Sequence, residues 1–507
     1  MRPISAVASL LILVPLLSAA AEPRQAGRPP PPLVITSVTV IDGNGGAPRP
    51  GMTVLIENGR IAELRPAARA GRRPADAREI DGSGRFLLPG FIDSNVHATV
   101  YGNAQRRETV VKYGHRNEEL ALEFLQRQLR HGVTTVRDSY GALVPLAAVR
   151  EKIANGEAVG ARILFAGNIV GWGGPFSMTF SLMQESDLTL FQANWNDWIA
   201  QGAGEEMLDM GPEEAREAIN RYLDKGPDFI KYGGTSHFRV PSLIGFAPRI
   251  QKVIVDETHK RGLIAETHAT SPEALRIAIE AGIDLIQHPE ILSREYPDDL
   301  VEMIVERNVL CAIRSNTLAG EPWRRHLAAR EAAAGTIAAM PPPRNSAEQR
   351  ARGEMLGEAY AIQRRNAERL IAAGCTVTIA TDNYQGDAPE FRKVPKPIEQ
   401  EAGIGSVLAI EGLVELGMSE MQAIVAATKN GAIAAGMPDV IGTIEPGKAA
   451  DLVLLEADPL ADIRNIRQVA HVIAAGRVID SERLPEQRIF MLPEHSSAGA
   501  RQRADSL

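Results

Sequence analysis

The sequence predicts an α/β protein: a (β/α)8 TIM-like barrel with a small β-sandwich domain formed by both chain ends. Three observations support this prediction. Apolar strands alternate with helical patterns over roughly 340 residues, from Gly90 to about Asn430, and such a barrel needs ~250 before insertions. Short alternating strands precede this stretch and return after it. The length of 507 residues accommodates one large and one small domain.

The first residues indicate an export signal. A charged start is followed by an apolar stretch from about Ala6 to Leu17 and then by small residues. This stretch is shorter than the roughly 20 residues of a membrane-spanning helix. We expect a signal peptide over 1–20, cleaved near Ala20 or Ala21, and an exported, periplasmic or secreted protein with no stable membrane span. An uncleaved anchor is the alternative. The proline-rich segment 21–32 is expected to be a linker.

The small β-domain is predicted from turn signals between alternating segments. Asp42-Gly43 and Asn58-Gly59 are typical of β-hairpins, and they lie within residues 33–85. Residues 436–485 have the same character, in GTIEPGKAADLVLLEADP and VAHVIAAGRVI. We therefore expect both ranges to form one domain, followed by a tail at 486–507.

The barrel is predicted over residues 86–435, and TSPEALRIAIEAGIDLIQHPE contains one complete unit. Ser271 is a helix N-cap, Pro272 occupies the first helical position, and Gly282 ends the helix before the next strand. Two segments exceed the basic unit. One, GWGGPFSMTFSLMQESDLTLFQANWNDWIAQGAG, holds three of the four tryptophans and either folds over the barrel mouth or packs on the surface. The other, from about Gly320 to Arg352, is expected to be helical apart from its MPPP interruption.

Composition limits the classes of partner. The formal net charge is -8, and both signs are interspersed, so we expect no nucleic-acid binding. The only cysteines, Cys311 and Cys375, lie in apolar runs, which excludes a disulfide framework and favours two small buried hydrophobes. A homo-oligomer is possible, although no heptad pattern indicates one.

Polar side chains follow five apolar runs: FIDSNVH, DFIKYGG, LIAETHA, DLIQHPE and VTIATDN. Residues at the carboxyl ends of barrel strands converge on one mouth. A histidine that ends a single strand is usually structural, but five such positions together predict a metal site. Its members would be His97, Lys231, His268, His288 and Asp382.

With these residues the chain resembles the amidohydrolase superfamily, particularly its imidazolonepropionase-like and Xaa-Pro dipeptidase-like members. HGVTTVRDSYG and IGTIEPGKAADLVLL are similar to characteristic segments of this superfamily. The resemblance implies two divalent metal ions, usually zinc, with a bridging hydroxide. It implies that Lys231 is an N6-carboxylysine, that His268 and His288 complete one site, and that His97 and Asp382 serve the other.

Asn95 departs from the pattern that the resemblance implies. It lies two residues before His97, on the same strand face, where a histidine is usual. An amide oxygen is a poorer zinc ligand than an imidazole nitrogen and suits harder ions. Asn95 is therefore expected either to be a weak metal ligand or to hydrogen-bond to a ligand.

The chemistry implied is metal-assisted hydrolysis, in which Asp382 takes a proton from water and passes it to the leaving group. Candidate substrate contacts follow the strands in IKYGGTSHFRV and CAIRSN: Tyr232, His237, Arg239, Arg314 and Asn316. Each is equally compatible with a structural role. The expected substrate is a dipeptide or N-acyl amino acid. Alternatives are a lactam, lactone or carbamate, or a non-catalytic binding protein on a decayed scaffold.

Overall fold

The structure of the protein is a computed structural model that describes residues 30–101, 107–238, 242–291 and 294–491. The predicted signal peptide, most of the predicted linker and most of the predicted tail lie outside these ranges, as does Arg239.

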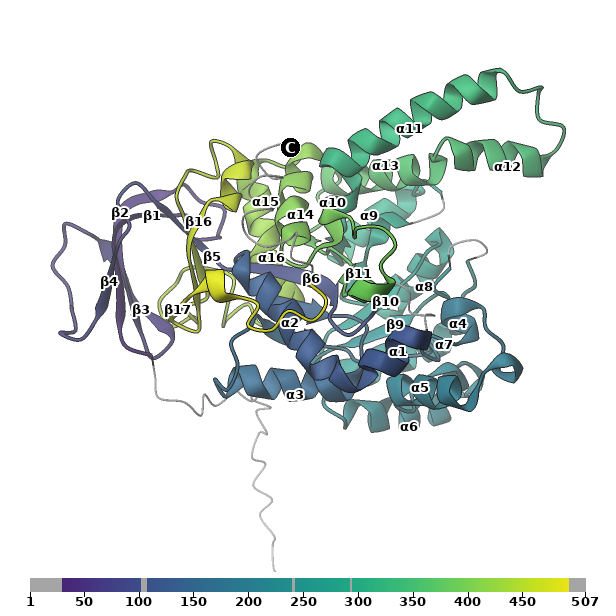
Figure 1. Ribbon diagram of the computed structural model, residues 1–507, viewed down its shortest axis with the longest axis horizontal. Helices are drawn as coiled ribbons and strands as arrows, with labels where there is room; N and C mark the ends of the chain where they lie inside the picture. The colour runs from purple at the N-terminus through teal and green to yellow at the C-terminus, as the bar shows by residue number, and fades with distance from the viewer. Residues whose placement is uncertain (1–29, 102–106, 239–241, 292–293, 492–507) are drawn as a thin grey trace, which may run out of the picture.

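Strands from both chain ends form one eight-stranded sheet at one side of the molecule (Figure 1). Its order is β17-β16-β15-β5-β1-β2-β3, with β4 paired to β1. Strand β5 joins the strands of the two chain ends, because it pairs in parallel with β1 and antiparallel with β15. The Asn58-Gly59 hairpin between β2 and β3 is confirmed, since both residues have positive φ. The strand bounds are β1 (Leu33–Val40), β2 (Arg49–Glu57), β3 (Arg60–Pro66), β4 (Arg78–Asp81), β5 (Phe86–Pro89), β15 (Leu452–Leu455), β16 (Val469–Ala474) and β17 (Arg477–Ile479).

The central strands are buried and parallel, in two sheets. One has the order β14-β6-β7-β8 and the other β13-β12-β11-β10-β9. A parallel bridge between Val170 and Tyr232 joins the sheets on one side, and on the other Asp382 donates its backbone N–H to the Asn95 carbonyl at 2.8 Å. The strand bounds are β6 (Phe91–His97), β7 (Val133–Asp138), β8 (Arg162–Phe165), β9 (Ile230–Gly233), β10 (Ala265–His268), β11 (Leu285–Gln287), β12 (Leu310–Ile313), β13 (Val377–Ile379) and β14 (Asn383–Tyr384).

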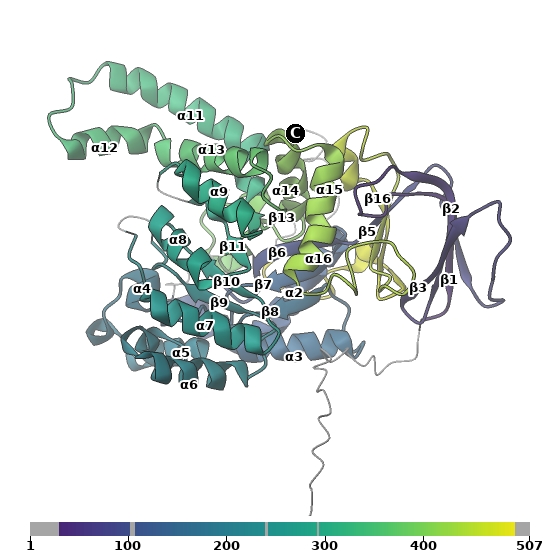
Figure 2. The ribbon, with the colours of Figure 1, turned by 180° about the vertical axis from the view of Figure 1, so that it is seen from behind.

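Helices surround these parallel strands (Figures 1 and 2). The predicted signals at α8 are confirmed: the Ser271 side chain accepts from the Ala274 N–H, and Gly282 ends the helix at φ 98°. The helix bounds are α1 (Arg107–Tyr113), α2 (Asn117–Arg130), α3 (Leu143–Ala154), α4 (Met178–Ser181), α5 (Leu190–Ala200), α6 (Pro212–Leu223), α7 (Pro248–Lys260), α8 (Pro272–Ala281), α9 (Asp298–Glu306), α10 (Ser315–Leu318), α11 (Gly320–Ala338), α12 (Ser346–Met355), α13 (Glu358–Ala372), α14 (Ile404–Glu415), α15 (Glu420–Ala427) and α16 (Lys429–Ala434).

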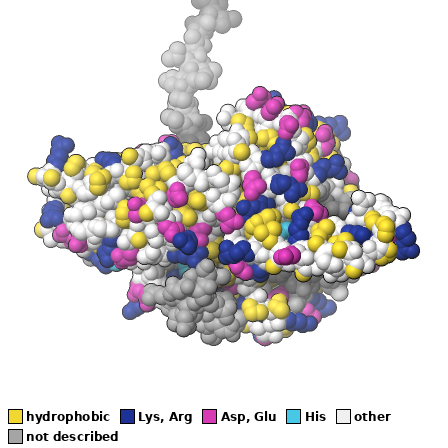
Figure 3. Space-filling model, turned by 90° about the horizontal axis from the view of Figure 1, so that it is seen from above, with side chains coloured by type: hydrophobic (Ala, Val, Ile, Leu, Met, Phe, Trp, Pro, Cys, Tyr) yellow, Lys and Arg dark blue, Asp and Glu magenta, His cyan; other side chains and the backbone are white. Residues whose placement is uncertain are grey.

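The second long segment is helical, as predicted. Helices α11 and α12 project from the body, and the connection between them contains the three consecutive prolines (Figure 1). Neither helix has a buried residue. Seen from above, the surface carries acidic and basic side chains side by side (Figure 3). Within the described ranges, no helix is both long and apolar enough to cross a membrane.

The two cysteines correct a sequence expectation. Cys311 and Cys375 are buried, as expected, but they form a disulfide with a Cα–Cα distance of 6.3 Å instead of being separate hydrophobes. The cause is the strand order. β12 pairs in parallel with β13, so Cys311 lies beside the turn that leads into β13, although 64 residues separate the cysteines in sequence.

Candidate metal and substrate site

The polar residues predicted at strand ends lie at one end of the parallel strands. Two pairs are in direct contact. His268 Nδ1 lies 3.2 Å from His288 Nε2, and His97 Nε2 lies 2.9 Å from Asp382 Oδ1. Lys231 is buried in β9, where charge interactions couple it to Asp382 and His268. The fold therefore brings all five residues to one site.

The backbone is unusual at two of these residues. His288 has φ 38° and Asp382 has φ 59°, in the left-handed region that residues other than glycine seldom adopt. Such conformations cost of order 1–3 kcal/mol and are found most often at functional sites. His288 directly follows β11, and Asp382 lies three residues after the end of β13, so both turns lie at the carboxyl ends of buried strands.

Burial sets the charge state of the site. It lowers the pKa of His268 and of His288 well below the ordinary value, so both imidazoles are neutral, the form that binds metals. Burial also lowers the pKa of Lys231, which favours the neutral amine that can react with carbon dioxide. Burial alone raises the pKa of Asp382, but the hydrogen bond with His97 and the nearby His288 and Arg314 hold it well below its usual range.

The donor set fits a divalent metal ion. Two nitrogens that bind one zinc tetrahedrally at about 2.0–2.1 Å lie ~3.3 Å apart, close to the 3.2 Å between the facing nitrogens of His268 and His288. Among the described residues, no group of three or more His, Cys, Asp or Glu side chains is close enough to hold an ion as arranged. The fit therefore rests on the two donor pairs together with Lys231.

Asn95 is fully buried beside Asp382. Its side-chain nitrogen donates to Asp382 Oδ1 at 3.4 Å, and its own Oδ1 has no hydrogen-bond partner in the described part of the chain. Leaving a buried amide oxygen unsatisfied costs roughly 1–3 kcal/mol. This oxygen is therefore available to a ligand that the structure does not contain.

Two residues that the sequence analysis did not single out hold His97 in place. The carbonyl of Tyr140 accepts from His97 Nδ1 at 3.1 Å, which leaves Nε2 directed at Asp382. Asp138 accepts from the Ala98 N–H at 2.6 Å. Both belong to the segment HGVTTVRDSYG at the end of β7, and its similarity to a known family was the only sequence signal for them.

Arg314 lies beside the candidate base. Its Nη1 donates to Asp382 Oδ2 at 3.2 Å and its Nε donates to Glu290 Oε1 at 3.1 Å. Glu290 is fully buried, and burial raises its pKa. The guanidinium is thus shared by two carboxylates, a geometry that orients Asp382.

The other predicted substrate contacts differ in position. Tyr232 is fully buried and donates to Gln251, because neighbours in a strand alternate and Lys231 takes the inner face. Asn316 donates to two backbone carbonyls, those of Thr381 and Glu399. Both side chains support the fold. His237 is exposed near His268, with ring centroids 6.2 Å apart, so it alone of these three borders the site.

The tryptophan-rich segment reaches the site. Trp172 is buried with its ring edge-on to His268, at a centroid distance of 4.9 Å. Phe180, from α4, stacks on His237 at 4.3 Å. The sequence left two positions open for this segment, over the barrel mouth or on the surface. The contacts of Trp172 and Phe180 place the beginning of the segment beside the strand-end residues.

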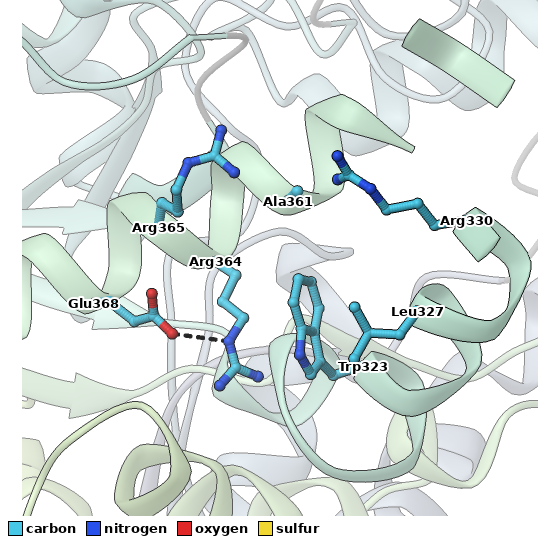
Figure 4. A pocket seen from close by; sticks show the side chains of 7 residues that line it. All are labelled: Trp323, Leu327, Arg330, Ala361, Arg364, Arg365 and Glu368. Carbon is cyan, nitrogen blue, oxygen red and sulfur yellow. Dashed lines mark hydrogen bonds and ion pairs between the residues drawn. The ribbon is translucent and has the colours of Figure 1, made fainter. Parts of the chain in front are cut away.

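A pocket between α11 and α13 lies apart from these residues (Figure 4). Trp323 lines this pocket, and the Arg364 guanidinium lies over its ring, 4.6 Å from the ring centroid. None of the predicted site residues lines it: the lining residues are Trp323, Leu327, Arg330, Ala361, Arg364, Arg365 and Glu368.

The chain belongs to the amidohydrolase family, whose model matches residues 86–479. Members of this family generally bind divalent metal ions and have a TIM-barrel fold. Molinate hydrolase has a similar solved structure, with 30% identity, a TM-score of 0.79, and coverage of 92% of this chain and 98% of that one. The structure of phenylurea hydrolase B is also similar, with 31% identity, a TM-score of 0.79, and coverage of 91% of this chain and 99% of that one.

Among curated proteins, ochratoxinase from Aspergillus niger is 25% identical over 367 residues. The match covers 69% of this chain and 66% of ochratoxinase, just under two thirds of its length. Imidazolonepropionases and a Xaa-Pro dipeptidase are also similar, as the sequence predicted. The named hydrolases among these relatives confirm the prediction of a hydrolase that acts on C–N bonds.

Proposed function

We propose that the protein is a metal-dependent amidohydrolase that cleaves an amide bond of a small substrate, such as a dipeptide or N-acyl amino acid. The observation that carries this proposal is the pair of buried, neutral histidines, His268 and His288, whose nitrogens face each other at 3.2 Å. Two neutral imidazoles at this distance can share a hydrogen bond, and with Lys231 and Asp382 nearby the same two nitrogens are placed to share a cation.

In this proposal His268 and His288 would hold one divalent ion, zinc being the leading candidate, and His97 and Asp382 would hold a second. Lys231, as N6-carboxylysine, would supply a further anionic ligand. Asn95 would contribute a weak oxygen ligand beside His97 and Asp382, in keeping with its unpartnered Oδ1. When bound, such ions lower the pKa of a water molecule and polarise the substrate carbonyl.

The protein's own residues perform the proton transfers. Asp382, kept ionised by His97 and Arg314, accepts the proton of the attacking water and returns it to the leaving nitrogen. Arg314, which is anchored to Glu290, orients that carboxylate. The Tyr140 carbonyl fixes the His97 ring so that Nε2 serves the site. His237 is the predicted substrate contact that remains at the rim.

We also infer the organisation of the chain. The contacts between the two parallel sheets, Val170 with Tyr232 and Asn95 with Asp382, support a closed (β/α)8 barrel over 86–435. The shared eight-stranded sheet supports a small β-domain from 33–85 and 436–485. The buried Cys311–Cys375 disulfide supports export, because disulfides persist in oxidising compartments.

A substrate screen tests the proposed function. Purified protein should hydrolyse at least some dipeptides or N-acyl amino acids, lose this activity after chelation and recover it with zinc. Lactams, lactones and carbamates belong in the same screen. A protein that binds metal but turns over none of these compounds would instead be the binding protein on a decayed scaffold, for which the weakened ligand at Asn95 is the specific observation.

The substitution Asn95→His should raise affinity for one metal ion only. An imidazole nitrogen replaces a weaker amide oxygen beside His97 and Asp382, while His268 and His288 are unchanged. Competitive chelation followed by metal counting measures this. The Asn95→His variant should retain one of its ions up to a chelator concentration at least about tenfold higher than the unmodified protein does. Identical loss profiles in both proteins would mean that Asn95 is not a metal ligand.

A further inference from the structure

Four aromatic rings form a continuous cluster against the candidate metal ligands. Tyr140 lies edge-on to His97 with centroids 6.2 Å apart, and Trp172 lies edge-on to His268 at 4.9 Å. Phe180 connects them, with its centroid 5.4 Å from Tyr140 and 5.7 Å from Trp172, and His237 stacks on Phe180. We call this set the aromatic wall. It touches one member of each donor pair.

The wall has a buried base and an accessible edge. Tyr140 and Trp172 are only 4% and 2% exposed, whereas Phe180 is half-buried and His237 is exposed. The rings of Phe180 and His237 are parallel to within 2°. The facing surfaces of Phe180 and His237 cover each other, so the exposed ring at the edge is His237, where an incoming flat group can stack or pack edge-on near His268.

Backbone contacts fix the edge of the wall. The Thr179 N–H donates to Glu205 Oε1 at 2.5 Å. The Thr179 carbonyl accepts from the His237 N–H at 2.9 Å. The Phe180 carbonyl accepts from His237 Nδ1 at 3.2 Å. Phe180 and His237 are thus tied to each other and to a third segment, so a ring that binds them need not order them first.

A second observation points to a ligand at the same place. The Tyr140 hydroxyl is buried and has no hydrogen-bond partner within the described ranges. Buried hydroxyls are usually satisfied, so this donor is available to a substrate atom.

We infer that Tyr140, Trp172, Phe180 and His237 form a subsite for a flat aromatic ring carried by the substrate. This inference rests on the proposed function for the position of the scissile bond. It selects, among N-acyl amino acids and dipeptides, those with an aromatic side chain next to the cleaved amide.

The test compares two amino acids that differ only in ring saturation, L-phenylalanine and L-cyclohexylalanine. They are the products of the corresponding N-acetyl substrates, so their binding to the zinc-loaded protein by calorimetry does not depend on turnover. An apolar pocket that does not recognise aromatic rings should bind cyclohexylalanine more tightly, because it is more hydrophobic, or should bind both amino acids equally. The aromatic wall should favour phenylalanine about two- to tenfold.

Variants locate this preference. Phe180→Leu should bring the ratio of phenylalanine affinity to cyclohexylalanine affinity to about one. His237→Leu, which removes the other edge ring, should also lower this ratio. Phe180→Tyr should preserve the ratio, as should the matched control Leu182→Ala, two residues further along and 58% exposed. Equal or weaker phenylalanine binding in the unmodified protein overturns the subsite, as does a ratio that neither ring substitution changes. Failure to hydrolyse N-acetyl-phenylalanine despite an intact ratio counts against the proposed reaction and leaves the subsite supported.

Discussion

Asp382→Asn should lower kcat by about a thousandfold or more while the protein remains folded. The amide cannot accept the proton of the attacking water, and general acid–base catalysis alone contributes roughly 10²–10⁴-fold. In the proposed function Asp382 is also a metal ligand, so the substitution should weaken metal binding as well. Steady-state kinetics with any substrate found in the screen would measure the loss.

The fold should survive Asp382→Asn for a local reason. Asp382 has φ 59°, and asparagine adopts this left-handed conformation more readily than most residues. The amide can still accept from Arg314. Circular dichroism and the thermal midpoint should therefore match those of the unmodified protein. The control Asp224→Asn, at an exposed pair with Arg261, should retain full activity. A kcat for Asp382→Asn within threefold of the original would remove Asp382 as the general base.

Lys231→Met should reduce bound metal from two ions to at most one per chain and lower turnover at least about a hundredfold. Methionine fills a similar volume in the buried β9 position but cannot form a carbamate. Loss of residues that only support ligands already costs 10–100-fold, so loss of a ligand should cost more. Elemental analysis of dialysed protein measures the ion count.

Lys396→Met is the matched control for Lys231→Met. Lys396 is also buried, and burial lowers its pKa to about 7, but its ammonium contacts the Tyr384 carbonyl. Both substitutions remove a buried lysine, so a general destabilisation would appear in both proteins. Only Lys231→Met should lose metal. Equal ion counts in the two variants would contradict the assignment of Lys231.

The strand-end residues were predictable from sequence because parallel strands bring their carboxyl ends together. His97, Lys231, His268, His288 and Asp382 each follow or end an apolar run, and no tertiary information was needed. Adjacent positions were harder to assign. Tyr232 was grouped with Lys231, although alternation within β9 turns it outward to Gln251.

Long-range pairings could not be predicted. Arg314 and Asp382 are 68 residues apart in sequence, and only the neighbouring positions of β12 and β13 bring them together. The same strand pairing produces the Cys311–Cys375 disulfide. Phe180 comes from a segment whose only signal was its tryptophan content, because such an insertion has no periodicity that indicates where it packs.

The central claim is that the strand-end residues hold a divalent metal centre. A crystal structure of protein prepared with zinc and bicarbonate, with diffraction measured at the zinc absorption edge, tests it most directly. The account predicts an anomalous peak bonded to His268 Nδ1 and His288 Nε2, a second peak at His97 and Asp382, and extra density on Lys231 between them. Zinc absent from His268 and His288, with an unmodified Lys231 pointing away from any ion, would contradict it.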